Sequence, residues 1–230
     1  MNHHRLFTAA MWAGVIALDF TGCGPFMVSQ PLVCGPLFGW LLGQVAVGVI
    51  LGGIIQLLWM DLSPIGVGIP YDATSTTLLA VYWASLPAHG SLSQSVLALL
   101  MAVPFGFLFR WFDQLARRVN TNFMHKVVRL SDEHLSLGLW AGVLGGLAWS
   151  WVRYTIAFGC LFYSGEFAWK RMAYWPRLTP IDQGLTMAVL LLPVAGMGVT
   201  LELLLSDEPE GRWAPWRTGK PSNKKEEPPV

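Results

Sequence analysis

Long apolar runs separated by short polar or Gly/Pro-rich breaks fill the first 205 residues of the chain. A bilayer's hydrocarbon core of about 30 Å needs roughly 20 apolar residues per helix. Several runs reach or approach that length, at residues 6–22, 72–86, 92–109, 135–162 and 181–205. The pattern predicts an all-α, polytopic membrane protein.

The run at residues 30–79 is different, because glycine recurs in it at positions 35, 39, 43, 48, 52 and 53. Glycines spaced by four let another backbone approach a helix closely. Residues 31–59 are too long for one crossing, so we expect two shorter helices, or a re-entrant hairpin followed by a helix. Two prolines and two glycines at 63–71 prevent a regular helix there, and Asp72 stands where the next helix would begin. The fold class expected is therefore an all-α membrane protein with broken or re-entrant helices, built from repeats.

Few polar side chains of any reach interrupt this apolar run: Gln30, Gln44, Gln56, Asp61 and Asp72. Such groups are costly at membrane depth unless they face a partner, a cavity or a substrate. Two interpretations stay open. In the first, these polar side chains contact a polar ligand. In the second, Gln44 and Gln56 form hydrogen bonds between helices and Asp72 caps a helix.

Composition agrees with a membrane protein, since 53% of residues are hydrophobic, 13% are charged and the mean hydropathy is +0.48. Residues 6–109 contain no Lys or Arg, whereas 110–133 contain five. We expect that basic segment to lie amphipathically at the cytoplasmic interface. Arg153 stands inside an apolar run and needs a carboxylate or a ring of carbonyls; Asp19, Asp61 and Asp72 are the candidate carboxylates. Asp19 itself is expected near interfacial water.

The chain lacks the marks of an enzyme that works alone or of a nucleic-acid-binding protein. There is no phosphate-binding P-loop, no zinc-binding HExxH and no CxxC pair, so we expect no cofactor and no metal. A net charge of +1 without a basic stripe argues against nucleic acid as a partner. Residues 206–230 are rich in proline and mixed charge and are expected to be a disordered tail after a membrane domain at 1–205.

The glycine run resembles the signature of the IIC component in the mannose/fructose/sorbose family of the bacterial sugar phosphotransferase system (PTS). That signature reads G-x3-G-[DNH]-x3-G-[LIVM]-[LIVM]-x-G-G-[STL]-[LT]-[EQ]. The matching residues are Gly39, Gly43, Gly48, Val49, Ile50, Gly52, Gly53 and Gln56. An Ile65-Gly66 turn and a Pro70-Tyr71-Asp72 segment follow as in the family. Gln44, Ile54, Ile55 and Tyr71 depart from it.

The resemblance implies a permease subunit of the bacterial cytoplasmic membrane that binds and translocates a hexose or related sugar. It implies an oligomer with a IID membrane subunit, and soluble IIA and IIB proteins that carry the phosphate. The sugar-binding candidates are Gln56 and Asp72 first, then Gln30, Gln44 and Asp61, with Gly39, Gly43, Gly48, Gly52 and Gly53 as structural glycines.

Two alternatives remain. The altered signature, and an apolar stretch of the family that gives way here to the charged tail, favour a degenerate IIC-like subunit that supports or regulates a complex without transporting sugar. The other is an unrelated small membrane protein whose glycines only pack helices.

Overall fold

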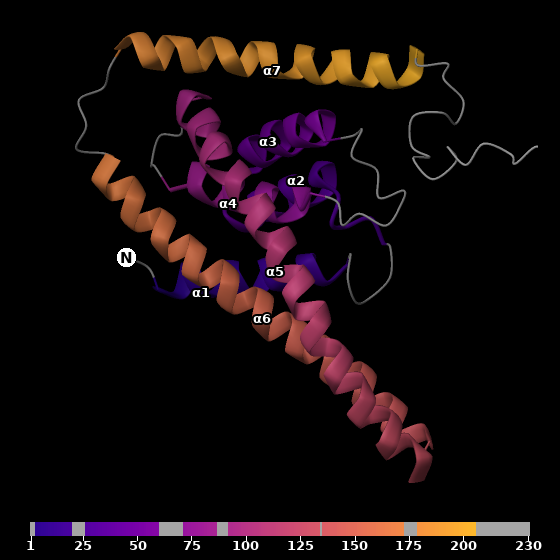
Figure 1. Cartoon of the computed structure of the whole chain (residues 1–230). Helices are drawn as coiled ribbons and strands as arrows, with labels where there is room; N and C mark the ends of the chain where they lie inside the picture. The colour runs from indigo at the N-terminus through magenta and orange to yellow at the C-terminus, as the bar shows by residue number, and fades with distance from the viewer. Residues whose placement is uncertain are drawn as a thin grey trace, which may run out of the picture.

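The computed structural model describes residues 3–19, 26–59, 71–86, 92–133, 135–172 and 179–205, and among these residues all regular structure is helical. Figure 1 shows the arrangement, with α7 lying across the top beside α3 and α1 lying below. In chain order the helices are α1 (His3–Leu18), α2 (Pro31–Leu41), α3 (Val45–Leu58), α4 (Ala73–Ala84), α5 (Leu92–Glu133), α6 (Leu135–Met172) and α7 (Thr179–Leu205).

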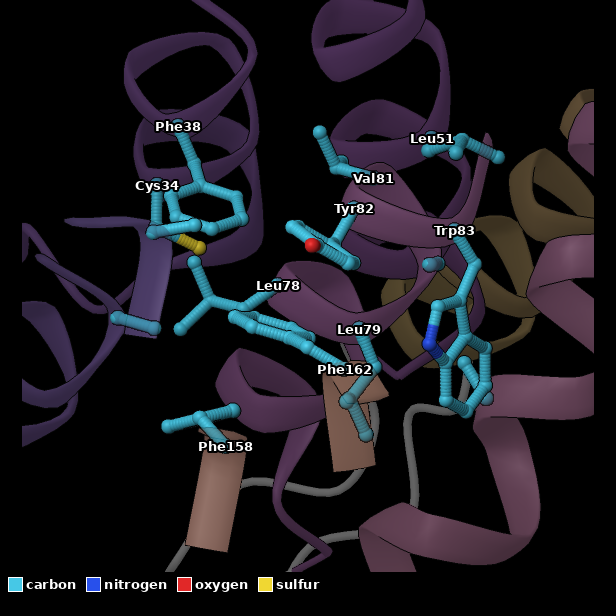
Figure 2. Close-up of a cluster of buried hydrophobic side chains, with 14 of the residues drawn as sticks. Cys34, Phe38, Leu51, Leu78, Leu79, Val81, Tyr82, Trp83, Phe158 and Phe162 are labelled. Carbon is cyan, nitrogen blue, oxygen red and sulfur yellow. The ribbon is translucent and has the colours of Figure 1, made fainter. Parts of the chain in front are cut away.

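The short helix α4 is the centre of the molecule. Every residue from Ser75 to Ala84 is buried, because α1, α2, α3, α5 and α6 all pack against α4. Figure 2 shows its apolar side chains meeting rings from α2 and α6. The ring of Tyr82 stacks on that of Phe162 with centroids 3.9 Å apart, and Phe38 lies 6.1 Å from Phe162. The second half of α4, residues 78–84, is apolar on every side, as expected of a fully enclosed segment.

Helices α2 and α3 form an antiparallel hairpin, as the broken pattern of residues 31–59 predicts. Pro31 opens α2, where a missing amide donor has no cost. The hairpin turns at Gly43, whose φ of +75° suits glycine. At 1.5 Å per residue the two helices are about 16 and 21 Å long, shorter than a bilayer's hydrocarbon core.

Helices α5 and α6 are longer than the apolar runs that predicted them. We expected a separate interface-lying segment at 110–133, but α5 continues through it as one helix to Glu133. Helix α6 likewise extends to Met172, beyond the predicted end of its span. The two run side by side as a long antiparallel hairpin (Figure 1). Continuous intrahelical hydrogen bonding therefore extends past the point where the apolar character ends.

In the described part of the chain, one helical stretch, Ser93–Ala116, is long and apolar enough to cross a bilayer. Shorter apolar helices occur at Pro31–Leu41, Val45–Leu58 and Thr186–Leu201. Asp61, most of the segment at 63–71 where no regular helix is expected, and the tail at 206–230 lie outside the described residues. The expectation of internal repeats stays a prediction.

Candidate functional site

The α2–α3 hairpin is held at backbone contact by its glycines. A Cβ on Gly48 or Gly52 would collide with the carbonyl of Gly35 or Pro31 on the facing helix. A Cβ on Gly39 would lie 2.8 Å from the Gln44 carbonyl oxygen. Close packing therefore requires three of the five predicted structural glycines, and the turn requires Gly43. Gly53 differs, because a Cβ there would meet nothing within 4 Å.

This register places two of the glutamines at the same end of the hairpin. Gly52 faces Pro31, so Gln56, one helical turn later, lies at the end where Gln30 precedes α2. The side-chain oxygen of Gln56 is buried and has no donor among the described residues. Gln30 is exposed and its side chain does not cap α2. Gln44 lies at the other end of the hairpin, beside the turn. The length of α2 separates it from Gln30 by about 16 Å.

Asp72 lies near this same end and caps α4. One carboxylate oxygen accepts the Ser75 amide at 2.9 Å, and the other accepts the Ser75 hydroxyl at 2.6 Å. The end of α3 is close, since the rings of Trp59 and Tyr71 stack with centroids 4.8 Å apart. These two donors belong to the helix that Asp72 precedes, which is the capping arrangement.

A polar bridge ties α4 to the segment before α2. The Thr74 hydroxyl donates to the Ser29 carbonyl at 2.6 Å. Asp19, at the end of α1, accepts the amides of Phe26 at 3.2 Å and Ser29 at 2.9 Å. We name Gln30, Gln56 and Asp72, with the adjoining Ser29 and Thr74, the hairpin-end cluster. Two helix N-termini, those of α2 and α4, meet there with polar groups from α1 and α3.

The placement of Asp19 and of the partner of Arg153 corrects two expectations. Asp19 is buried, with 7% of its surface exposed, so it holds backbone amides and does not reach interfacial water. Among the described residues Arg153 pairs with Asp113 on α5, at 3.4 Å, and not with Asp19 or Asp72; the third expected carboxylate, Asp61, lies outside them. The sequence does not indicate Asp113 as the partner, because Asp113 lies in the basic segment that is expected at the membrane interface.

A second polar network lies near the opposite end of α4. The Tyr82 hydroxyl donates to Glu166 at 2.7 Å, which links α4 to α6. Arg5 donates to the Leu42 carbonyl at 3.3 Å and to the Ser85 hydroxyl at 3.5 Å. These contacts join the N-terminus of α1, the hairpin turn and the end of α4. No sequence motif indicated them, because each member stands alone in its own run.

The sequence comparisons with known proteins both match IIC components of the PTS or permeases. The sequence model of the family described as "PTS system sorbose-specific IIC component" matches residues 5–209. The putative N-acetylgalactosamine permease IIC component 2 of Escherichia coli (strain K12) is 31% identical over 80 residues, which are 35% of this chain and 59% of that protein. The match thus spans less than two thirds of that relative's length.

Two solved structures share the fold. A chain described as a membrane protein superposes with a TM-score of 0.67 and 19% identity, covering 88% of this chain and 78% of the other. A chain of the mannose transporter ManYZ, solved by cryo-EM in complex with microcin E492, has a TM-score of 0.60 and 18% identity, covering 94% and 83%. At these identities the likeness establishes a shared helical fold.

Proposed function

Because this chain belongs to the sorbose-specific IIC family of the PTS, we propose that it is the subunit that binds and translocates a hexose or related sugar. In this proposal the chain crosses the bacterial cytoplasmic membrane several times and assembles with a IID membrane subunit. Soluble IIA and IIB proteins supply the phosphate. One structural neighbour is a chain of the mannose transporter ManYZ, whose name joins two components, and this supports a two-subunit assembly.

The hairpin-end cluster is the proposed sugar site, and the observation that carries it is the position of Gln56. A sugar is recognised by pairing its hydroxyls with acceptors and donors on an otherwise apolar wall. Gln56 offers a buried oxygen that has no donor among the described residues. A buried acceptor without a donor costs about 1–3 kcal/mol, and a sugar hydroxyl would remove that cost. Gln30 lies at the same end of the hairpin.

The test compares two glutamines on the same hairpin. Gln56→Leu should lower sugar uptake at least about tenfold in cells that also express the IIA, IIB and IID proteins, because the polar contact is lost. Gln44→Leu is the matched control, since Gln44 lies at the other end and its side chain makes no cap hydrogen bond. Equal uptake by the two variants, with equal amounts of protein in the membrane, would remove Gln56 from the site.

A supporting subunit without transport is the second candidate, and the capping geometry of Asp72 favours it. Both oxygens of this carboxylate accept hydrogen bonds from Ser75, so a purely structural role accounts for these hydrogen bonds. Thermal melting of the purified complex with IID distinguishes the candidates. A transporter is stabilised by a millimolar sugar from a panel of hexoses, amino sugars and sorbose. An intact complex that no sugar stabilises would indicate the supporting subunit.

A further inference from the structure

Tyr71, the residue just before Asp72, joins three helices. It is buried, with 7% of its surface exposed. Its ring stacks on Trp59 at the end of α3, with centroids 4.8 Å apart and an angle of 13° between the planes. The same ring meets Phe107 on α5 edge to face, also with centroids 4.8 Å apart. Helix α5 packs against α4 (Figure 1), so Tyr71 is held between the end of α3, the start of α4 and the middle of α5.

The Tyr71 hydroxyl fixes the position of this ring through polar contacts. It donates to the Val103 carbonyl on α5 at 2.8 Å. The Thr76 hydroxyl on α4 lies 2.8 Å from the Tyr71 oxygen and 2.9 Å from the Asp72 carbonyl, so its single proton serves one of these two acceptors at a time. Ring contacts tolerate a range of offsets, whereas hydrogen bonds of this length require a defined direction. The hydroxyl is therefore the part of Tyr71 that defines its place between α4 and α5.

Gly106 on α5 makes room for this hydroxyl. A Cβ at Gly106 would collide with the ζ carbon and the hydroxyl oxygen of Tyr71, and with the Thr76 hydroxyl. The missing side chain thus lets the Tyr71 ring reach the backbone of α5. Tyr71 is one of the residues that depart from the family pattern, so that pattern does not account for the contact.

Tyr71 also lies between the two residues ranked first for sugar binding. Asp72 is its neighbour in the chain. Gln56 precedes Trp59 by three residues, and residues three apart on a helix are neighbours on its surface. A displacement of the Tyr71 ring would therefore move Asp72 relative to the end of α3 that carries Gln56. Binding groups have to be held within about 0.5 Å of their productive geometry by packing and by supporting hydrogen bonds.

We propose that Tyr71 is a positioning residue of the sugar site, whose hydroxyl holds Asp72 and Gln56 at the separation that fits the sugar. This inference rests on the proposed function, because it gives Tyr71 a part in binding the transported sugar. Tyr71 acts through its neighbours and not by touching the sugar. A tyrosine that only stabilises the fold changes the amount of folded protein and hence the maximal uptake rate. A positioning residue changes the KM for the sugar.

Uptake kinetics of two tyrosine variants test this role. Cells that also express the IIA, IIB and IID proteins are given radiolabelled mannose, sorbose or N-acetylgalactosamine, and KM and the maximal rate are determined separately. Tyr71→Phe keeps the ring and removes the hydroxyl. It should raise KM about tenfold at a similar maximal rate per protein, because one hydrogen bond to the sugar is misplaced.

Tyr82→Phe is the matched control for the loss of a tyrosine hydroxyl. It removes the hydrogen bond to Glu166 at the opposite end of α4, so KM should stay unchanged. Each variant loses one hydrogen bond to a neighbouring helix, and each should melt about 2–4 °C below the unaltered protein. Similar melting temperatures with different KM values would distinguish positioning from stability.

Two threonine variants keep the test decisive if Tyr71→Phe does not fold. Thr76→Val removes the hydroxyl beside Tyr71 and should raise KM about threefold, less than Tyr71→Phe because the Tyr71–Val103 hydrogen bond remains. Thr77→Val removes a hydroxyl that donates at 2.7 Å to a carbonyl of its own helix, so KM should stay unchanged. Both threonines are fully buried, which makes the two changes comparable.

The possible outcomes separate this inference from the proposed function. Normal uptake by the unaltered protein, with the same KM in Tyr71→Phe and Tyr82→Phe or in Thr76→Val and Thr77→Val, would overturn the positioning role alone. An equal rise of KM in Tyr71→Phe and Tyr82→Phe would also overturn it, because KM would then follow stability. An intact complex that takes up none of the three sugars in its unaltered form would contradict the transport function, and this inference with it.

Discussion

At the scale of single residues, the predicted sugar-binding residues have different roles, although the sequence ranks Gln56 and Asp72 equally. Asp72 is engaged by donors of its own helix. Gln56 has a buried oxygen without a donor among the described residues. Gln44 lies at the turn end, and its backbone carbonyl accepts the Gly48 amide at 3.2 Å. Burial and hydrogen bonding therefore rank Gln56 above Asp72 as a ligand contact.

The capping role of Asp72 predicts how its variants differ. Asp72→Ala should cost about 1 kcal/mol, because α4 loses its N-cap, whereas Asp72→Asn keeps a capping oxygen and should cost only a few tenths. Thermal melting of the purified protein measures the difference. If Asp72→Asn melts like the unaltered protein but loses uptake, the negative charge acts on the sugar. Equal destabilisation by both variants would contradict capping.

At the scale of elements, the glycine pattern predicts the α2–α3 hairpin because the constraint is local. Close backbone approach requires glycine at fixed spacing, and the turn requires φ near +75° at Gly43. The same pattern does not reveal which of the glycines face the partner helix. Gly52 and Gly53 look equivalent in the sequence, yet only Gly52 is in backbone contact with the facing helix.

Alanine at these neighbouring positions should therefore have opposite effects. Gly52→Ala forces a Cβ against the Pro31 carbonyl and should destabilise the protein by about 1–3 kcal/mol, the usual cost of overpacking. Gly53→Ala meets open space and should be neutral or stabilise α3 by up to about 1 kcal/mol, because alanine is the better helix former. Melting temperatures of the two variants decide the matter, and a larger loss for Gly53→Ala would refute the observed register.

At the scale of the whole molecule, the sequence predicts the helical class and the broken hairpin but not the long-range pairs. The length of an apolar run and the spacing of glycines are local patterns, so both can be recognised in a single sequence. The pairing of Arg153 with Asp113 joins residues 40 apart. Only the antiparallel register of α5 and α6 brings them together, and that register depends on α5 continuing as one helix past Arg110. Hydropathy indicates where a membrane span ends, not where a helix ends, so it predicts an interface segment where α5 in fact continues.

The Arg153–Asp113 pair should therefore behave as a long-range link between the two longest helices. Both side chains are largely buried, at 12% and 15% exposed. Arg153→Met alone leaves a buried carboxylate without its arginine and should destabilise the protein by about 3 kcal/mol, and Asp113→Leu should cost a similar amount. The double variant leaves neither charge unpaired, so it should melt closer to the unaltered protein than either single variant does. Additive losses in the double variant, measured by thermal melting in the same detergent, would show that the two side chains act independently and that other contacts hold α5 against α6.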